Sequence, residues 1–367
     1  MTNGKKFILL YVVSADGYCD ACTDLYPEFI TVASLFAREK NIFFGKVSDS
    51  KLIDMLDIKE FPSVVYYEHG SASHQPLLGD ISIDNLVSTV KKGMRGDFSD
   101  IQIKYTVPLT DSTFEECIAN PRQHAFIIVY DKDSASTAEA ELKLFEDLAM
   151  TFKHDEELLI GSINATKEIK LAGDFAVKRY PAFYWYGKGD KSIRKRYGGR
   201  MDIDELLAFV NDQTNLDRKL GGELMESAGR VPELDTLVAM YIDDIMEGVE
   251  LEAAIADAKE YAKNAKINRK YAPYYVTLLK KINDAGKVEV IDEERDHQVK
   301  LLTIGELTPK QKDDLMRKRN ILHRFVDEMA MRLIDGDRET VRVVRGNKQN
   351  KAKKSDHVQH DDLHQEL

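Results

Sequence analysis

The chain has 367 residues, of which 43% are hydrophobic and 31% are charged, a composition typical of folded domains rather than of a disordered chain. This length allows two or three domains. The formal net charge of −11 argues against a general nucleic-acid-binding protein. The sequence holds no run of about 18 or more apolar residues, so we expect no insertion into a membrane as a helix.

The first predicted element is a buried strand over residues 7–13, FILLYVV. Its apolar run is short and rich in aromatic and β-branched residues, which favours a strand over a secretory signal peptide. Cys19 and Cys22 follow this strand in the sequence GYCDAC. Three interpretations of the pair are open: a redox-active dithiol, half of a metal site, or two small core residues.

The cysteine count narrows these alternatives. The chain holds three cysteines, which are too few for a disulfide framework. A structural zinc site needs four ligands, and no second CxxC motif is present to complete one. A group of histidines near the C-terminus could bind a metal weakly, but a solvated polar tail is the simpler interpretation; its members are His357, His360 and His364. We therefore predict no metal and no cofactor.

An internal repeat organises the first part of the chain. Strand-like sequences begin near Phe7 and Phe126, and an aromatic–Pro step follows each of them 55 residues later, at Pro62 and Pro181. Further along, GDISIDNLVSTV from Gly79 parallels GRMDIDELLAFV. These matches predict a duplicated unit of roughly 110 residues.

Each unit alternates strands with helical patterns, which predicts an α/β sheet with helices packed on it. The second unit also opens with an extra strand and helix, in the segment VPLTDSTFEECIANPRQH. Only six residues precede Phe7, so the first unit has no counterpart of this segment. We expect the first domain to lack its opening strand and helix, which a truncated gene model would explain.

A strand that leads into a CxxC motif at a helix start, followed by an aromatic–Pro step before another strand, resembles the thioredoxin fold. Two such units in tandem resemble a protein disulfide isomerase. The resemblance implies that Cys19 and Cys22 are the redox centre and that Pro62 is a cis proline packed beside them. Pro181 is the second candidate for a cis bond.

The third segment is similar to the all-helical C-terminal domain of some disulfide isomerases and of a small ER thioredoxin-like chaperone. The similarity lies in the Gly221–Gly222 step, the AGRVPELD turn and the segment KDDLMRKRNILHRFVDEM. Four parts are predicted: a thioredoxin-like domain with the CxxC motif, a second one without it, the helical domain and a disordered tail. Their boundaries are 1–98, 102–214, 215–333 and 334–367.

The chain ends in HQEL, which fits the tolerant form of the KDEL retrieval signal; its residues are His364, Gln365, Glu366 and Leu367. Beside the disulfide isomerase pattern, this ending predicts residence in the lumen of the endoplasmic reticulum and recognition by a KDEL-type receptor. Retrieval requires entry into that compartment, so we again expect sequence to be missing before Met1.

The helix that follows the cysteine pair, expected to begin between Cys22 and Asp24, gives the two sulfurs different roles. Unpaired N–H groups at a helix N-terminus favour a thiolate, so Cys19 is the expected attacking thiol and Cys22 the resolving one. Asp20 stands between them, and its negative charge should raise the pKa of Cys19 relative to a site that carries histidine there. We expect a site poised for reduction or isomerisation, with modest turnover.

Other residues that support such a site in the family are absent. Residues 10–13 contain no acid, and Asp80 replaces the arginine of the late YxGxR turn. Lys46 matches the family's basic residue, but without its acid it is expected to be an exposed lysine at a strand end.

The second unit has no cysteine at the corresponding loop. Ala138 and Glu141 stand where Cys19 and Cys22 would align, so this unit is predicted to bind substrate or to act as a spacer. Cys117 is predicted to be a buried core thiol.

The leading hypothesis is a thiol–disulfide oxidoreductase or isomerase that acts on unfolded or misoxidised secretory proteins in the ER lumen. The alternative is a largely non-catalytic ER chaperone or escort protein with a vestigial CxxC motif. A cytosolic thioredoxin-like reductase is a third option, and it requires HQEL to be a coincidence. No nucleic acid or membrane is expected as a partner, and the sequence leaves open whether two copies form a homodimer.

Overall fold

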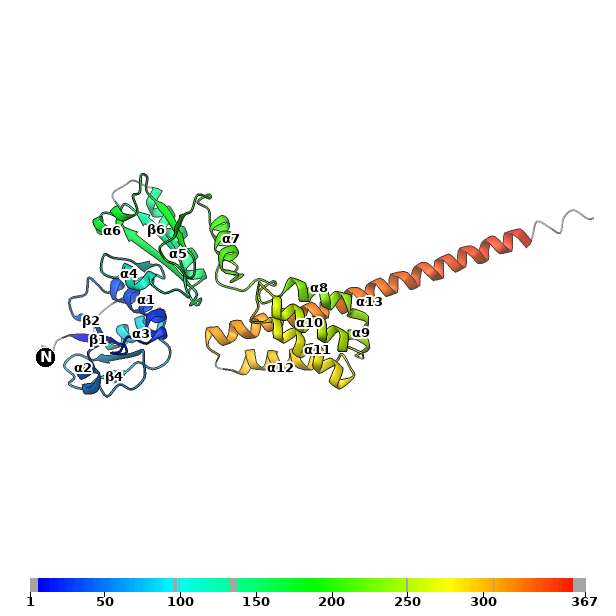
Figure 1. Cartoon of the computed structure of the whole chain (residues 1–367), viewed down its shortest axis with the longest axis horizontal. Coiled ribbons are helices and arrows are strands. Elements are labelled where there is room, and N and C mark those ends of the chain that lie inside the picture. Colours follow the sequence, from blue (N-terminus) through cyan, green and yellow to red (C-terminus); the bar gives the residue numbers. More distant parts are fainter. Residues whose placement is uncertain are drawn as a thin grey trace, which may run out of the picture. The chain divides into compact units, whose positions relative to one another are not determined.

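The computed structural model describes residues 6–94, 98, 100–132, 137–248, 250–305 and 307–358. The chain divides into two compact units, Met1–Glu223 and Leu224–Leu367. The first unit contains both sequence repeats, which are called its first and second halves from here on. The first unit contains two β-sheets with their helices, and the second is built from helices (Figure 1). The predicted fold class, thioredoxin-like α/β domains followed by an all-α domain, is confirmed.

The first sheet has four strands in the order β2-β1-β3-β4. β1 pairs in parallel with β2 and antiparallel with β3, and β3 pairs antiparallel with β4. The elements of this half are, in chain order, β1 (Phe7–Val12), α1 (Asp20–Leu35), β2 (Ile42–Val47), α2 (Ser50–Met55), β3 (Ser63–Tyr67), β4 (Gln75–Pro76) and α3 (Ile83–Gly93).

Helices cover both faces of the first sheet, because alternate side chains of a strand point to opposite faces. Phe7, Leu9 and Tyr11 of β1 are fully buried in a cluster with Phe29 of α1 and Leu86 of α3. A smaller cluster, which includes a residue of α2, packs separately; its buried members are Val12, Val47, Ile53, Leu56 and Val65.

The second sheet has five strands in the order β5-β7-β6-β8-β9. β5 and β6 run parallel to β7, whereas β8 is antiparallel to both β6 and β9. Its elements are β5 (Val107–Pro108), α4 (Phe114–Ile118), β6 (His124–Tyr130), α5 (Thr137–Thr151), β7 (Leu158–Asn164), α6 (Ile169–Asp174), β8 (Ala182–Tyr186), β9 (Arg194–Arg196) and α7 (Ile203–Thr214).

The repeat predicted from the sequence is visible in this topology. The strand order β2-β1-β3-β4 of the first sheet reappears as β7-β6-β8-β9 in the second, with the same parallel and antiparallel pairs. β5 and α4 form the extra strand and helix expected at the start of the second half. In the described part of the first sheet, no strand lies beyond β2.

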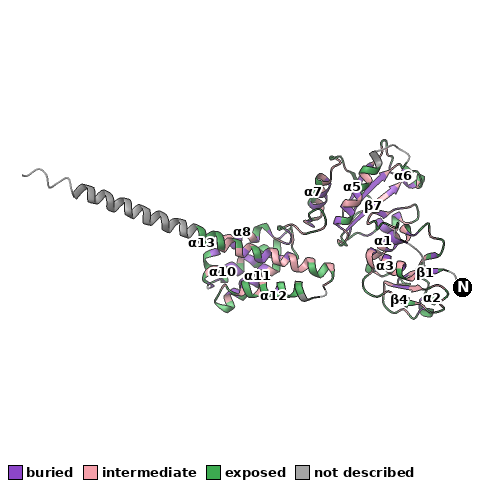
Figure 2. Ribbon diagram, turned by 180° about the vertical axis from the view of Figure 1, so that it is seen from behind, coloured by how far each residue is buried: buried purple, intermediate pink, exposed green. Residues whose placement is uncertain are grey.

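The core of the second half is rich in aromatic rings. All five residues of β8 are buried: Phe183 and Trp185 belong to one cluster, and Tyr184 and Tyr186 belong to another. Figure 2 shows buried residues along the strands of this half. β8 is therefore a central core strand.

A buried ion pair ties the segment after α7 to the second sheet. Arg218 and Asp155 have side chains that are 3% and 7% exposed, and two nitrogens of the guanidinium contact the carboxylate at 2.6 and 2.8 Å. A third nitrogen of Arg218 donates to the carbonyl of Gly222 at 2.7 Å. These contacts hold the residues up to Glu223 with the first unit, although the sequence assigned 215–223 to the helical domain.

The second unit buries one apolar cluster between its helices. Tyr275 and Phe325 are its largest fully buried side chains, and the Tyr275 hydroxyl donates to Asp235 at 2.6 Å. The helices are α8 (Pro232–Met240), α9 (Ile242–Glu247), α10 (Glu252–Asn264), α11 (Ala272–Ala285), α12 (Val290–Ile304) and α13 (Pro309–Val358).

The AGRVPELD turn needs its glycine. Gly229 has a φ of +83°, and a Cβ placed there would come within 2.6 Å of the Cβ of Arg317. Both facts exclude a larger residue, because positive φ and close approach are accessible to glycine alone at low cost. The turn thereby brings the start of α8 against α13.

The prediction of a disordered tail from residue 334 differs from the structure. α13 continues to Val358, since the lysine- and arginine-rich sequence contains good helix formers and no proline. HQEL lies outside the described residues. Among the helices that the structure describes, none combines the length and the apolar character needed to cross a membrane.

Candidate active site

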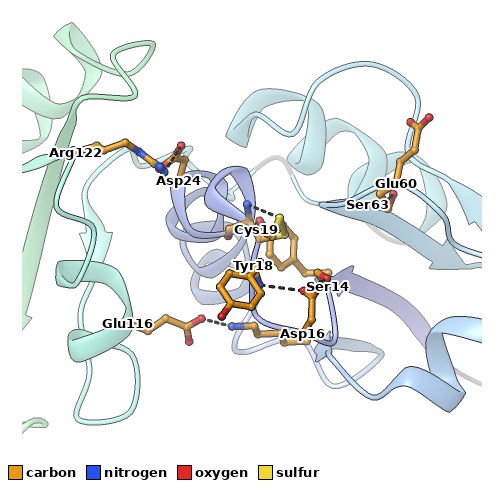
Figure 3. The surroundings of a disulfide bond; sticks show 12 residues. Ser14, Asp16, Tyr18, Cys19, Asp24, Glu60, Ser63, Glu116 and Arg122 are labelled. Carbon is orange, nitrogen blue, oxygen red and sulfur yellow. Dashed lines mark hydrogen bonds and ion pairs between the residues drawn. A yellow bond between two sulfur atoms is a disulfide. The ribbon is translucent and has the colours of Figure 1, made fainter.

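The loop between β1 and α1 is shaped by one aspartate. An oxygen of Asp16 accepts hydrogen bonds from the Ser14 hydroxyl at 2.5 Å and from the Tyr18 backbone N–H at 3.0 Å, and these bonds lower the pKa of Asp16. Gly17 has a φ of +77°, which glycine adopts without strain. The loop leaves Tyr18 exposed next to the cysteine pair (Figure 3).

The two cysteines lie at the first turn of α1. Cys19 is the N-cap residue, so the helix begins at Asp20, slightly earlier than the sequence predicted. The sulfur of Cys19 accepts a hydrogen bond from the backbone N–H of Cys22 at 3.1 Å. The two sulfurs form a disulfide with Cα atoms 5.2 Å apart, and Cys22 is buried while Cys19 is half-buried. The more accessible sulfur therefore occupies the positive end of the helix.

Pro62 reaches the same edge of the sheet from another strand. It follows a cis peptide bond, as predicted, and lies directly before β3, whose Ser63 pairs with Val12 at the end of β1. The loop to Cys19 leaves β1 at that same end. Glu60 and Ser63, which flank the cis proline segment, belong to the surroundings of the disulfide in Figure 3.

A buried tyrosine anchors the CxxC turn to the sheet. The hydroxyl of Tyr11 donates to the backbone carbonyl of Cys22 at 2.8 Å, and the ring packs against Tyr26 and Phe29 of α1. Burial, and to a smaller extent the nearby Glu116, raises the pKa of Tyr11. Tyr11 thus occupies the stretch of β1 in which the sequence showed no acid.

Carboxylates of α1 contact the second half of the first unit. Arg122 forms ion pairs with Asp20 and with Asp24, the latter through one nitrogen at 2.9 and 3.2 Å from the two oxygens (Figure 3). The amide of Asn120 donates to Asp24 at 2.6 Å. The negative charge between the two cysteines therefore has a positive partner.

Lys46 also has a partner in the second half. Its ammonium forms an ion pair with Glu116 of α4 and lies 4.3 Å from the ring centroid of Tyr26. As expected, Lys46 is exposed and lies near the end of β2, and its side chain is in addition held between an acid and an aromatic ring.

No pattern in the sequence pointed to these ion-pair partners. Arg122 and Asp24 are separated by 98 positions in the chain, and Lys46 and Glu116 by 70. No local pattern links residues at such distances, and only the packing of the two halves brings them together.

Comparisons with known proteins give one matching family model and several sequence relatives. Residues 229–325 match the family model "Endoplasmic reticulum protein ERp29, C-terminal domain". The chain is 24% identical over 313 residues to probable protein disulfide-isomerase A6 of Medicago sativa, covering 84% of each chain. It is 25% identical over 339 residues to protein disulfide-isomerase erp38 of Neurospora crassa, covering 90% of this chain and 89% of the relative. Over most of its length the chain is therefore similar to proteins named protein disulfide-isomerases.

A further relative and a solved structure complete the comparison. Protein disulfide-isomerase 1 of Dictyostelium discoideum is 25% identical over 328 residues, which cover 84% of this chain and 86% of the relative. Full-length ERdj5 is matched at a TM-score of 0.29 and 17% identity over 58% of this chain and 30% of that one. The similarity to disulfide isomerases rests on the sequence relatives and the family model.

The second half of the first unit carries no dithiol. Pro181 follows a cis bond, as predicted, but the helix α5 that corresponds to α1 contains Ala138 and Glu141 in place of cysteines. Cys117 is free and buried, and burial raises its pKa to about 12, which confirms the prediction of a core thiol. Among the described residues, a pair of neighbouring cysteines is therefore present in the first half alone.

Among the described residues, no cluster of three or more His, Cys, Asp or Glu side chains is placed to hold a metal ion. The side chains of the C-terminal histidines considered above, His357, His360 and His364, lie outside the described ones.

Proposed function

We propose that the protein is a thiol–disulfide oxidoreductase or isomerase that assists oxidative folding of secretory proteins, with Cys19 attacking and Cys22 resolving. The observation that carries the proposal is the Cys19–Cys22 disulfide at the N-terminus of α1, on the same edge of the sheet as the cis Pro62. Homologues named protein disulfide-isomerases support the class of reaction.

The reduced site reacts by two successive exchanges. The Cys19 thiolate attacks one sulfur of a substrate disulfide, forming a mixed disulfide and releasing the other substrate sulfur as a thiolate. Cys22 loses its proton and attacks the sulfur of Cys19, which releases the second substrate thiolate. The substrate disulfide gains two electrons and becomes two thiols, and the Cys19–Cys22 pair is oxidised to the disulfide. The reverse sequence oxidises a substrate, and a substrate thiol that attacks the mixed disulfide isomerises it.

Position and exposure favour this division of roles. Cys19 is the more accessible sulfur and lies at the helix N-terminus, where N–H groups stabilise a thiolate. Cys22 is buried, so a bulky substrate disulfide reaches it less readily. Pro62, at the adjoining loop, would contact the bound substrate chain.

The test is catalysis of disulfide exchange by the full chain. We expect wild-type protein to reduce insulin with a thiol reductant and to refold a scrambled substrate, and Cys19→Ser to be inactive. Cys22→Ser should accumulate a mixed disulfide with the substrate, because its resolving thiol is gone. Cys117→Ser is the matched control and should retain activity, since Cys117 is buried away from the pair. Equal activity of wild type and Cys19→Ser would refute the proposal.

A second candidate is an ER chaperone or escort protein whose CxxC motif turns over little. The absence of an acid at residues 10–13 and the presence of Asp80 in the turn before α3 favour it. This function predicts that the full chain suppresses aggregation of a reduced client and that Cys19→Ser suppresses it equally well. The two assays together distinguish the candidates.

The ER lumen is the proposed compartment, with a KDEL-type receptor as partner of the C-terminal His364-Gln365-Glu366-Leu367. The full chain, fused behind a cleavable signal peptide, should remain in cells. Deletion of the four residues should send it to the medium, whereas deletion of the same number of residues just before them should not. Secretion of both forms alike would exclude retrieval through HQEL.

A further inference from the structure

The dithiol site contains a charge that should oppose its own chemistry. Asp20 is the first residue of α1 and directly follows Cys19, so it brings a carboxylate one residue from the sulfur that must become a thiolate. Like charges disfavour each other, and a carboxylate at this place lowers the thiolate fraction of Cys19. The side chain of Asp20 is 84% exposed.

Arg122 meets this charge from the second half of the first unit. One guanidinium nitrogen pairs with Asp20, and another contacts both oxygens of Asp24 one turn further along α1. The planar guanidinium can hold two carboxylates in this way, which a lysine ammonium cannot do in the same geometry. Figure 3 shows Arg122 reaching Asp24 from the neighbouring half.

The loop that carries Arg122 is itself fixed. Asn120 is 3% exposed; its amide donates to Asp24, and its side-chain oxygen accepts from the backbone N–H of Arg122 at 3.0 Å. The same asparagine thus binds α1 and orients the backbone of the arginine. The position of Arg122 is therefore set by its backbone contact with Asn120 as well as by the ion pairs of its side chain.

We propose that Arg122 is a positioning residue for the Cys19–Cys22 pair: by binding Asp20 it partly offsets the negative charge that opposes the Cys19 thiolate. The second half, which has no cysteine at its own loop, thereby sets the redox balance of the first. This inference rests on the proposed dithiol function. It differs from that proposal in that the controlling group acts through Asp20 and never contacts a substrate.

The test uses the reduced full chain and two readouts. Thiolate formation at Cys19 is followed by ultraviolet absorbance against pH, with Cys19→Ser as the blank. The dithiol–disulfide equilibrium is measured in glutathione buffers, where one oxidised glutathione is reduced to two thiols as the pair closes. Arg122→Gln should lower the thiolate fraction about threefold and shift the equilibrium toward the protein disulfide, since exposed ion pairs have modest effects.

The mutant cycle with Asp20 decides whether the arginine acts through that residue. Asp20→Asn alone should raise the thiolate fraction, and Arg122→Gln should have a clearly smaller effect in the Asp20→Asn background. Asp20 is exposed, so this single variant is expected to fold whatever happens to the interface. An equal effect of Arg122→Gln with and without Asp20 would overturn the proposal.

Arg200→Gln is the matched control. Arg200 is an exposed arginine of the same half, paired with Glu205 and Asp202 away from α1, and its loss should leave both readouts unchanged. Equal shifts in Arg122→Gln and Arg200→Gln would also overturn the inference. If wild-type protein did not equilibrate with glutathione at all, the proposed function would fail, while the thiolate titration would still report on Arg122.

Discussion

Glu28 has an unusual environment for a carboxyl group. It is half-buried between α1 and α3, and burial raises its pKa to about 7, with the charges of Asp84 and Asp80 adding to the rise. The backbone N–H of Ile83 donates to it and partly opposes the shift. The folded chain therefore holds this proton more tightly than the unfolded chain does.

Glu28→Gln should change how stability depends on pH. The folded pKa lies above the unfolded one, so for wild type the free energy of unfolding falls as pH rises from about 4.5 to about 7. Glutamine does not titrate, so across this window the free energy of unfolding of the variant should rise relative to that of wild type. The expected change is on the order of 2 kcal/mol, after allowance for partial exposure. Urea unfolding of both proteins at several pH values measures this difference. Exposed Glu68→Gln is the control, and parallel profiles for wild type and Glu28→Gln would contradict the prediction.

The buried pair of Arg218 and Asp155 makes a second prediction for single residues. Asp155→Asn leaves a guanidinium buried without its counter-charge, so the first unit should lose about 3 kcal/mol of stability. Arg200→Gln, in an exposed pair, should cost far less. The measurement is the urea midpoint followed by fluorescence of Trp185, the single tryptophan. A small effect, similar to that of Arg200→Gln, would show that the buried pair is not needed.

Corresponding helices of the two halves begin in the same way. Ser82 caps α3 by accepting from the N–H of Asn85 at 3.3 Å, and Asp202 caps α7 by accepting from the N–H of Glu205 at 2.9 Å. The caps lie in the segments that matched in the sequence. The repeat is therefore preserved in the hydrogen bonds that start each helix.

Ser82→Ala should destabilise the first unit by about 1 kcal/mol, because it leaves a helix N–H without its acceptor. Ser82→Gly should destabilise it by only a few tenths of a kcal/mol, since glycine lets water reach the same N–H group. Urea unfolding of the two variants measures the difference. Equal losses for alanine and glycine would mean that the cap bond contributes little.

The two halves of the first unit share a core contact. Ile30 of α1 packs against the apolar cluster of the second half, and α1 contacts both β5 and α4. Together with the ion pairs of Arg122 and Lys46, this contact places the CxxC helix between its own sheet and the neighbouring half. We therefore expect the halves to unfold together.

Ile30→Ala tests this coupling. It removes partly buried methyl groups, so we expect a loss of about 1.5 kcal/mol. Trp185 lies in the second half, yet the urea midpoint that its fluorescence reports should fall, because the halves are coupled. Ile169→Ala, at a site that is 75% exposed, should shift it by less than about 0.5 kcal/mol. An unchanged Trp185 transition in Ile30→Ala would show that the halves unfold separately.

Much of the fold could be predicted because its signals are local. The alternation of strands and helices, the duplicated segments and both cis prolines are set by residues near each other in sequence. The position of Cys19 and Cys22 at a helix start is local too, and only its first residue was misplaced. For the tail from residue 334, charge suggested disorder, whereas α13 extends to Val358 through a stretch that contains no proline.

The sequence by itself determined the two cysteines, their order at the start of α1 and the proline loop that lies at the same edge of the sheet. The tertiary structure decided their electrostatic surroundings. Asp20 read alone is an uncompensated charge beside Cys19, and Lys46 is a lysine without its acid. Packing of the second half supplies Arg122 and Glu116 to them. The physical reason is that a side chain's charge acts over a few ångströms of space, and residues 70 or more positions apart become neighbours only when the two halves pack.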